Sequence, residues 1–386
     1  MRILILGWYY DDNLGDAVLT ECTAALLRQK YPQAELVIRD LMARQQYPER
    51  KPVSMNMLLR RWALVRILSL VTRLGWDKQL QHELQRINRL QGSLPDVTDG
   101  DFDVAVFAGG QLFMDNIALY VADAVNRLQQ RNIPVFFNAC GLGPSCSAAI
   151  QQRLAAAVQT ENVHYVSCRD DVARLNRWCG REIAVPVSDP ALYTGVAFGV
   201  QKDSQAKTVG LGIMFANTMP LAASFRFWRR LIRELRKRRM PWKIFTNGSE
   251  ADMIFARRIL SSLPELNGQE EQYLCPAPRE PAELVRLIAS FGSLISYRLH
   301  SHIIACSLDI PTVAVQWDRK LPFFFEKIGC PERCLTAKAT PKQVLAALEK
   351  AQADGYDRAA ISSQHADACA KLFEAVDPYL TDRGTL

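Results

Sequence analysis

The sequence lacks the patterns that mark several large protein classes. Its ten cysteines are scattered, and no two are spaced as Cys-x-x-Cys. It has no zinc-finger spacing, no RNP-like aromatic motif and no long Lys/Arg tail, so nothing indicates nucleic acid as a partner. No apolar run is long enough to span a membrane, and the N-terminus has no signal-peptide pattern. We therefore expect a cytoplasmic protein with reduced thiols.

Several catalytic motifs are missing as well. The turn after the first apolar run, residues 10–17, is not G-x-G-x-x-G, so the fingerprint of nicotinamide cofactors is absent. There is no P-loop and no G-x-S-x-G elbow, which disfavours kinases and serine hydrolases. His300, His302 and Asp318 resemble a ligand set, but His-x-His places both imidazoles on one face only in a strand, and a helix begins here. We expect no metal and no cofactor.

What is present indicates a folded protein of two domains. The chain has 386 residues, of which 49% are apolar and 23% are charged. This length exceeds one typical core, so two domains are expected. The formal net charge of +7 is modest. It suits anionic ligands or an anionic membrane surface as partners.

Short apolar runs alternate with helical patterns, which is typical of parallel, doubly wound α/β sheets. We expect strands at residues 2–7, 35–39, 103–108, 135–139, 164–167 and 183–187, and again at 209–213, 243–246, 272–274, 294–297 and 311–316. The sequence thus predicts a GT-B-like fold, in which two Rossmann-like domains face each other across a cleft. We assign residues 1–200 to the first domain, 201–345 to the second, and 346–386 to a helical tail that packs back across the hinge.

Two basic segments interrupt this scheme. Residues 58–76 are very apolar, but their arginines do not gather on one helical face. Residues 225–239 form a cleaner pattern, with an apolar side and a side rich in arginine. The second segment is either an ordinary surface helix or a surface that docks on anionic lipid headgroups. We expect membrane proximity, on the inner face of the cytoplasmic membrane.

The most distinctive stretch is Ser-Tyr-Arg-Leu-His-Ser-His at residues 296–302. An expected strand at 292–296 precedes it and an expected helix at 303–308 follows it. A strand-to-helix turn exposes backbone N–H groups and the positive end of a helix dipole, which attract anions. Arg298 can grip a carboxylate or phosphate with two hydrogen bonds, and His300 can carry a proton near neutral pH. The simpler alternative is a buried histidine and an arginine paired with an acid.

Four other expected strands end in polar or glycine-rich turns. They are Asn13-Leu14-Gly15-Asp16, Gly109-Gly110-Gln111, Ser167-Cys168-Arg169-Asp170 and Asn247-Gly248-Ser249. Open α/β sheets bind ligands at such strand ends. Each turn also has a simpler interpretation: a helix capped by Asn13 or Asp16, close packing of a helix on glycine, a surface ion pair, or an ordinary turn.

Together these motifs resemble the polysaccharide pyruvyl transferase family over nearly the whole chain. The resemblance rests on Asn13-Leu14-Gly15-Asp16, Gly109-Gly110, Ser167-Cys168-Arg169-Asp170, Asp189-Pro190 and Arg298-Leu299-His300-Ser301. The chain departs from the family pattern at Gln111 and Asp12, where a glycine is usual. Both departures lie in the first half, where they affect acceptor contacts more than donor chemistry.

The resemblance implies transfer of a pyruvyl group from phosphoenolpyruvate to two hydroxyls of a sugar, in a surface polysaccharide such as a capsule or exopolysaccharide, or in its lipid-linked precursor. Catalysis would fall to His300, Arg298 and Arg169. The expected donor-binding residues are Arg298, Leu299, His300, Ser301, Arg169 and Asn247. The expected acceptor-binding residues are Asn13, Gly15, Asp16, Gly109, Gly110 and Gln111.

This chemistry suits the residue types. Phosphoenolpyruvate carries a carboxylate and a phosphate, so its binding in a dehydrated cleft requires cations such as Arg298 and Arg169. Its central carbon becomes electrophilic when the methylene is protonated, a step that we assign to His300. The base is either Asp16 or Asp170. Two alternatives stay open: a GT-B glycosyltransferase that uses a nucleotide sugar, and a non-catalytic partner in polysaccharide assembly.

Overall fold

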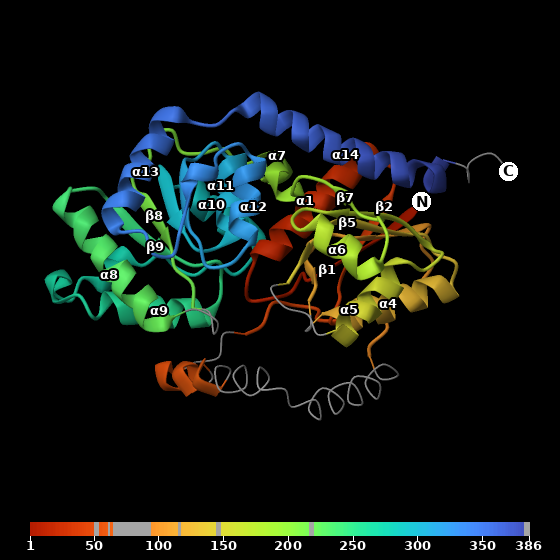
Figure 1. Ribbon diagram of the computed structural model, residues 1–386, viewed down its shortest axis with the longest axis horizontal. Coiled ribbons are helices and arrows are strands. Elements are labelled where there is room, and N and C mark those ends of the chain that lie inside the picture. The colour runs from red at the N-terminus through yellow and green to blue at the C-terminus, as the bar shows by residue number, and fades with distance from the viewer. Residues whose placement is uncertain are drawn as a thin grey trace.

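The computed structural model describes residues 1–49, 54–60, 62–64, 94–114, 117–143, 148–215 and 220–381. Within these residues the chain forms two parallel β-sheets, each covered by helices (Figure 1). The first sheet has the strand order β2-β1-β3-β5-β6-β7, with β4 paired to β5. Its strands are β1 Arg2–Gly7, β2 Glu35–Asp40, β3 Val104–Phe107, β4 Gly110–Phe113, β5 Val135–Leu142, β6 Val163–Cys168 and β7 Val185–Pro186.

Alternation along β1 explains how the first sheet is covered on both faces. Leu4 and Leu6 belong to the core cluster beneath the helices α4 and α5, while Ile3 and Ile5 belong to the cluster on the opposite face. Successive side chains of a strand point to opposite faces, so a strand that is apolar throughout is buried between two layers. The helices of this domain are α1 Gly15–Lys30, α4 Ala118–Gln130, α5 Ala148–Val158, α6 Val172–Cys179 and α7 Thr194–Ala197, with the 3₁₀ turn η1 at Pro190–Tyr193.

The second sheet has the order β12-β11-β10-β8-β9 and is also parallel. Its strands are β8 Val209–Gly212, β9 Trp242–Phe245, β10 Ser293–Ser296, β11 Thr312–Val315 and β12 Cys334–Leu335. Its helices are α8 Leu221–Lys237, α9 Glu250–Leu260, α10 Pro281–Ala289, α11 Leu299–Ser307, α12 Lys320–Lys327 and α13 Pro341–Asp354, and its 3₁₀ turns are η2 Pro264–Leu266, η3 Glu270–Tyr273 and η4 Pro331–Arg333.

The strand predicted at residues 272–274 is wrong. Residues Glu270–Tyr273 form the 3₁₀ turn η3, and Leu274 makes only a single bridge to Ile244 of β9. Two strands were also not predicted, β4 and β12. The helix expected at 303–308 begins earlier, at Leu299, so the Leu-His-Ser part of the distinctive stretch forms its first turn.

The chain returns to the first domain through its last helix, α14 Arg358–Thr381 (Figure 1). Leu372, Val376 and Leu380 are buried and join the same apolar cluster as Ile3 and Ile5 of β1. The predicted α/β fold, with two domains and a C-terminal helix that crosses back, is confirmed. The boundaries that we placed at residues 200 and 345 stay predictions.

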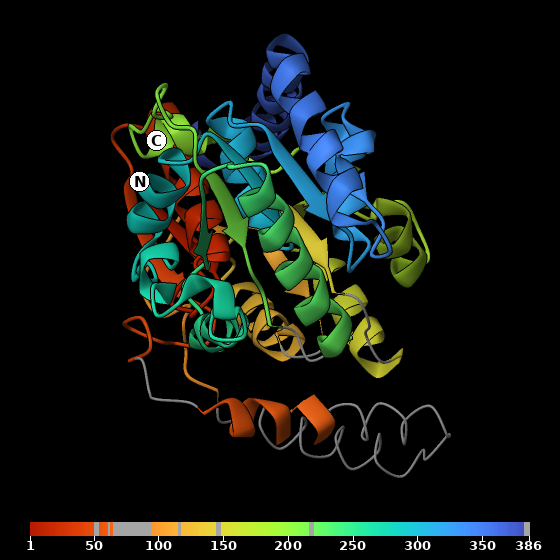
Figure 2. The same cartoon turned by 90° about the vertical axis from the view of Figure 1, so that its left-hand side faces the viewer.

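Of the two basic segments, the second is described in full. Helix α8 buries Trp228, Leu231, Ile232 and Leu235 as expected, and it lies beside α13 on the outer side of the second sheet (Figure 2). Arg233 on its other side pairs with Glu265. The segment 58–76 lies outside the described residues except for 58–60 and 62–64. Contact with an anionic membrane surface stays a prediction.

Helices long enough and apolar enough to cross a membrane do not occur among the described residues.

Candidate active site

The two domains meet where the first turns of α1 and α11 face each other. The Leu14 N–H donates to the Asn247 carbonyl across the interface at 2.9 Å. Gly15 lies so close to His300 that a Cβ added to it would be 2.3 Å from the imidazole Nδ1. A residue without a Cβ is therefore required there. The simpler interpretation of this turn, a helix capped by Asn13 or Asp16, is not what the structure has, because the N-cap of α1 is Leu14 and no side chain caps the helix.

His300 is buried among polar groups from both domains. Its Nε2 lies 3.0 Å from Nη1 of Arg169 and 3.9 Å from Oδ1 of Asp16. Because a guanidinium can only donate, Nε2 accepts the hydrogen bond and the imidazole proton lies on Nδ1. Burial, together with the positive charges of Arg169 and Lys320, holds the pKa of His300 well below its usual range. The imidazole is thus neutral in the free protein.

Arg169 is held by Asp189, the acid of the Asp-Pro motif. The two side chains form a buried ion pair through Nη1 and Oδ2, and Oδ1 of Asp189 accepts the N–H of Ala191 at 2.9 Å. Only 7% of Arg169 is exposed. Its Nε is buried and has no partner among the described residues. The aspartate therefore orients the guanidinium while leaving donors available for a ligand.

The two candidate bases differ in their surroundings. Asp170 accepts the N–H groups of Leu142 and Asp171, at 3.1 and 2.7 Å, and so joins β5 to the start of α6. Asp16 has a buried Oδ1 without a hydrogen-bond partner among the described residues. Burial raises the pKa of Asp16 to about 6, against the opposing effect of Arg169. Asp16 is the acid with a free oxygen beside His300.

Arg298 lies at the N-cap of α11, and its guanidinium is paired with Asp252 of α9. Asp252 is fully buried and also accepts the N–H of Phe215 at 2.7 Å. The Arg298 side chain is 19% exposed. The simpler interpretation of this arginine, a pair with an acid, is therefore present in the structure. A carboxylate occupies part of the fork and leaves the other donors of Arg298 for a ligand.

The remaining residues expected at the donor have two kinds of surroundings. The Ser301 hydroxyl donates to Oδ1 of Asn247 at 2.8 Å, and both residues are buried. Leu299 packs in an apolar cluster with Phe324 and Ile303. Ser301 and Asn247 thus connect two strand-end turns of the second domain, whereas the Leu299 side chain serves packing.

Gly109 and Gly110, which were expected at the acceptor, both have left-handed backbone conformations. The φ angles are 81° at Gly109 and 80° at Gly110, where residues with a Cβ are strained. A Cβ on Gly110 would lie 2.8 Å from Oδ1 of Asp16. The pair therefore allows the turn before β4 to lie against the start of α1, which is the packing alternative named above.

Gln111 connects the two domains through a residue that the sequence analysis missed. Its Nε2 donates to the Leu142 carbonyl at 3.2 Å, and its Oε1 accepts from Nζ of Lys320 at 3.2 Å. Lys320 begins α12, directly after the turn that follows β11. Lys320 could have been found in the sequence from its position at a strand end, directly after the Gln316-Trp317-Asp318 turn of the second domain. Burial lowers the pKa of Lys320, while Asp318 opposes the shift.

His302 has a structural role. Its Nδ1 lies 2.6 Å from the Thr312 hydroxyl and its Nε2 lies 3.1 Å from the Ser296 carbonyl. Burial lowers its pKa to about 3, so it is neutral and donates from Nε2 to the carbonyl. Among the described residues no group of three or more His, Cys, Asp or Glu side chains could hold a metal ion.

Four polar atoms of the residues expected at the site are buried and lack a hydrogen-bond partner among the described residues. They are Oδ1 of Asn13, Oδ1 of Asp16, Nε of Arg169 and Nδ2 of Asn247. Buried polar atoms in folded proteins are almost always paired with protein, water or ligand, so these four atoms are available to a polar ligand. Both donors and acceptors are among them, as a molecule with acidic and hydroxyl groups requires.

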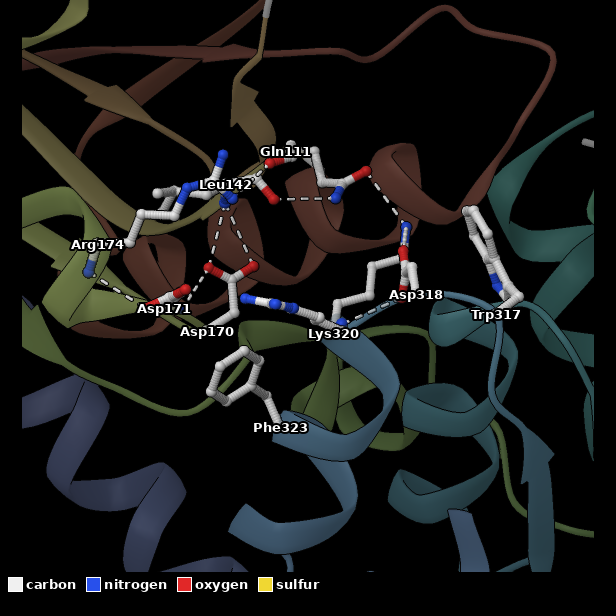
Figure 3. A pocket seen from close by; sticks show the side chains of 11 residues that line it. Gln111, Leu142, Asp170, Asp171, Arg174, Trp317, Asp318, Lys320 and Phe323 are labelled. Atoms are coloured by element: carbon white, nitrogen blue, oxygen red, sulfur yellow. Dashed lines mark hydrogen bonds and ion pairs between the residues drawn. The ribbon is translucent and has the colours of Figure 1, made fainter. Parts of the chain in front are cut away.

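A cavity of about 450 Å³ opens between the domains (Figure 3). It is lined by Gln111, Leu142, Gly143, Asp170, Asp171, Arg174, Trp317, Asp318, Arg319, Lys320 and Phe323. In Figure 3 the Lys320 side chain reaches from the second domain to the amide of Gln111, and Trp317 and Phe323 supply aromatic walls. Its size is within the range of small-molecule sites.

The sequence profile of the polysaccharide pyruvyl transferase family matches residues 13–319. The chain belongs to this family. The match extends from Asn13 of the first domain to Arg319, so it contains every motif on which the resemblance was based. The coarse function that follows is that of a transferase family acting on polysaccharides. Comparison with curated proteins gives no sequence match.

Solved structures similar to this family member share its fold at low identity. The UDP-GlcNAc 2-epimerase of Neisseria meningitidis bound to UDP-GlcNAc has a TM-score of 0.58 at 11% identity, with 98% of this chain and 100% of that chain covered. A putative UDP-N-acetylglucosamine 2-epimerase of Listeria monocytogenes has a TM-score of 0.58 at 10% identity, covering 99% and 97%. The S. aureus MnaA–UDP structure has a TM-score of 0.51 at 10% identity, with 97% of this chain and 93% of that chain covered. At this identity the likeness shows the fold alone, and it confirms the GT-B-like architecture.

Proposed function

We propose that the protein transfers a pyruvyl group from phosphoenolpyruvate to two hydroxyls of a saccharide, forming a cyclic ketal and releasing phosphate. The observation that carries the proposal is the contact of His300 with Arg169 and Asp16 at the domain interface of a member of this family. The acceptor would be a sugar of a surface polysaccharide or of its lipid-linked precursor. No cofactor enters the proposal.

The donor explains why His300 is surrounded by cations. Phosphoenolpyruvate carries about three negative charges near neutral pH, from its carboxylate and its phosphate. Arg169 and Arg298 remain charged and offer free donors to these groups. The arriving negative charge favours the imidazolium form and so raises the pKa of His300 from its depressed value. The protonated imidazole then gives its proton to the methylene carbon.

Two hydroxyls of the acceptor complete the reaction. The first attacks the cationic central carbon and loses its proton to Asp16, whose free oxygen lies beside His300. The C–O bond to phosphate then breaks with its electron pair going to the phosphate oxygen. The second hydroxyl adds to the same carbon and closes the ring. The two hydroxyls together release two protons. One of them makes up for the proton that His300 gave to the methylene carbon, and the other leaves with the phosphate.

A comparison of donors tests the proposal. Phosphoenolpyruvate should raise the thermal unfolding temperature, because a ligand at 100 times its Kd adds about 2.7 kcal/mol to the free energy of unfolding. A panel of glycosides with adjacent free hydroxyls should then release phosphate from phosphoenolpyruvate. Release of UDP from UDP-sugars, without any effect of phosphoenolpyruvate, would favour the glycosyltransferase. Binding of phosphoenolpyruvate without turnover on any glycoside would favour the non-catalytic partner.

The pH dependence tests the base. Below pH 6 the Asp16 carboxyl holds a proton and cannot accept another, because its pKa is raised to about 6. We expect kcat at saturating phosphoenolpyruvate, where the bound donor keeps His300 protonated, to fall as the pH drops and Asp16 takes up a proton. Asp16→Asn should remove this acidic limb and lower kcat about 10²- to 10⁴-fold.

Asp170→Asn is the matched control, since Asp170 bonds to backbone N–H groups. It should lower the thermal unfolding temperature and leave the acidic limb in place. If the limb disappears in Asp170→Asn and persists in Asp16→Asn, the base is Asp170.

A further inference from the structure

Of the three cations that line the cavity of Figure 3, Arg174, Arg319 and Lys320, only the charge of Lys320 is among those that lower the pKa of His300. Lys320 also lines a smaller void beside Arg169, Asp189 and Lys327. His300 lines neither of these spaces. A ligand that enters the 450 Å³ cavity therefore meets the Lys320 amine before it meets the imidazole.

The position of the amine is determined by three groups. Nζ of Lys320 lies 3.2 Å from Oε1 of Gln111 and 3.3 Å from Oδ2 of Asp318. It also lies 5.0 Å from the centre of the Trp317 ring, which favours a cation over its face. An ammonium has three N–H donors, and the described residues accept two of them. One donor is left for a ligand.

Lys320 is electrostatically part of the site around His300. It lies close enough to lower the pKa of His300, and its charge opposes the burial that raises the pKa of Asp16. Arg169 and Arg298 are each already paired with an aspartate, so their charges are partly compensated. A donor with about three negative charges therefore requires a further cation.

We propose that Lys320 binds the phosphoryl group of the donor and stabilises it as it leaves, so that the phosphate faces the cavity. This inference rests on the proposed function, since it assigns one group of the same donor. The donor carboxylate then lies toward Arg169 and Arg298, and the methylene carbon toward His300. When the C–O bond breaks, the electron pair goes to the phosphate oxygen beside the Lys320 ammonium. The released phosphate leaves through the cavity.

Ligands that share only one half of the donor test this placement. Phosphoenolpyruvate, pyruvate and inorganic phosphate are titrated into the wild type and Lys320→Met by calorimetry. We expect Lys320→Met to weaken the binding of phosphoenolpyruvate about 10- to 100-fold, since it removes a hydrogen bond to a charged group. The binding of phosphate should weaken by a similar factor. The affinity for pyruvate, which has no phosphate, should change less than about twofold.

Lys320→Arg is the second variant. It keeps the charge and should retain more of the phosphoenolpyruvate affinity than Lys320→Met if the contact is electrostatic. Lys202→Met is the control for loss of one positive charge, because Lys202 forms an exposed pair with Asp309. This variant should bind all three ligands as the wild type does. Thermal unfolding of each variant shows whether it is folded.

Each outcome has a separate meaning. If Lys320→Met loses affinity equally for pyruvate and phosphoenolpyruvate, or loses affinity for neither, the assignment is overturned. Lys320 would then serve only as a link between the domains. A wild type that binds phosphate through Lys320 but not phosphoenolpyruvate would keep the phosphate site and overturn the proposed donor. A wild type that binds none of the three ligands would overturn both proposals.

Discussion

Replacing His300 by alanine is expected to lower kcat about 10²- to 10⁴-fold while the protein stays folded. In the proposed mechanism the imidazole supplies the proton for the methylene carbon, and its Nε2 faces both Arg169 and Asp16. Affinity for phosphoenolpyruvate should change much less than kcat, because the arginines and Lys320 supply the charge that holds it. Steady-state phosphate release and a binding titration measure the two effects separately.

His164→Ala is the matched control for His300→Ala. His164 belongs to β6 and packs against Tyr379 of α14, with ring centres 4.5 Å apart and the rings tilted by 30°. Its loss should affect the unfolding temperature and leave kcat close to that of the wild type. Addition of imidazole should restore part of the activity of His300→Ala, since the substitution leaves a space of that shape. Near-normal kcat in His300→Ala would show that the assigned acid is wrong.

Gly15→Ala is expected to lower kcat/KM about 10²-fold, although the change adds only one methyl group. The new Cβ would lie 2.3 to 2.6 Å from atoms of His300, so the imidazole or the domain interface has to move. A displacement of about 1 Å at a catalytic group lowers the rate about 10²-fold. Overpacking also lowers the free energy of unfolding by about 1–3 kcal/mol. Within α1 itself alanine is the better helix former, so the loss arises at the interface.

A double-mutant cycle separates the two contributions. In the His300→Gly background, which removes the His300 Cβ as well as the ring, the clash is absent, and Gly15→Ala should no longer lower the unfolding temperature. Gly195→Ala in α7 is the control, because its Cβ would come no closer than 3.3 Å to the Leu308 side chain. An equal loss of stability in both backgrounds would show that the Gly15 contact with His300 does not form in solution.

The strands show how far local patterns extend. β1 was predicted at its observed bounds, because its run of apolar residues is buried on both faces and no competing turn signal interrupts it. The stretch 272–274 is only Gln-Tyr-Leu, and Leu274 lies beyond the edge strand β9, where a single bridge to Ile244 is its only strand pairing among the described residues. Whether a short apolar run becomes a strand depends on a neighbouring strand that is distant in the sequence.

The candidate site shows a comparable division. The sequence determined the residue types at the strand ends, the two-domain α/β fold and the apolar face of α8, since these follow from local periodicity and from where parallel strands end. Only the tertiary structure decided that Asp170 is occupied by backbone N–H groups while Asp16 has a free oxygen. It also placed Lys320 beside Gln111 and paired Arg298 with Asp252. Such pairings depend on which turns of the chain meet, and residues 46 and 209 positions apart leave no periodic signal of that contact.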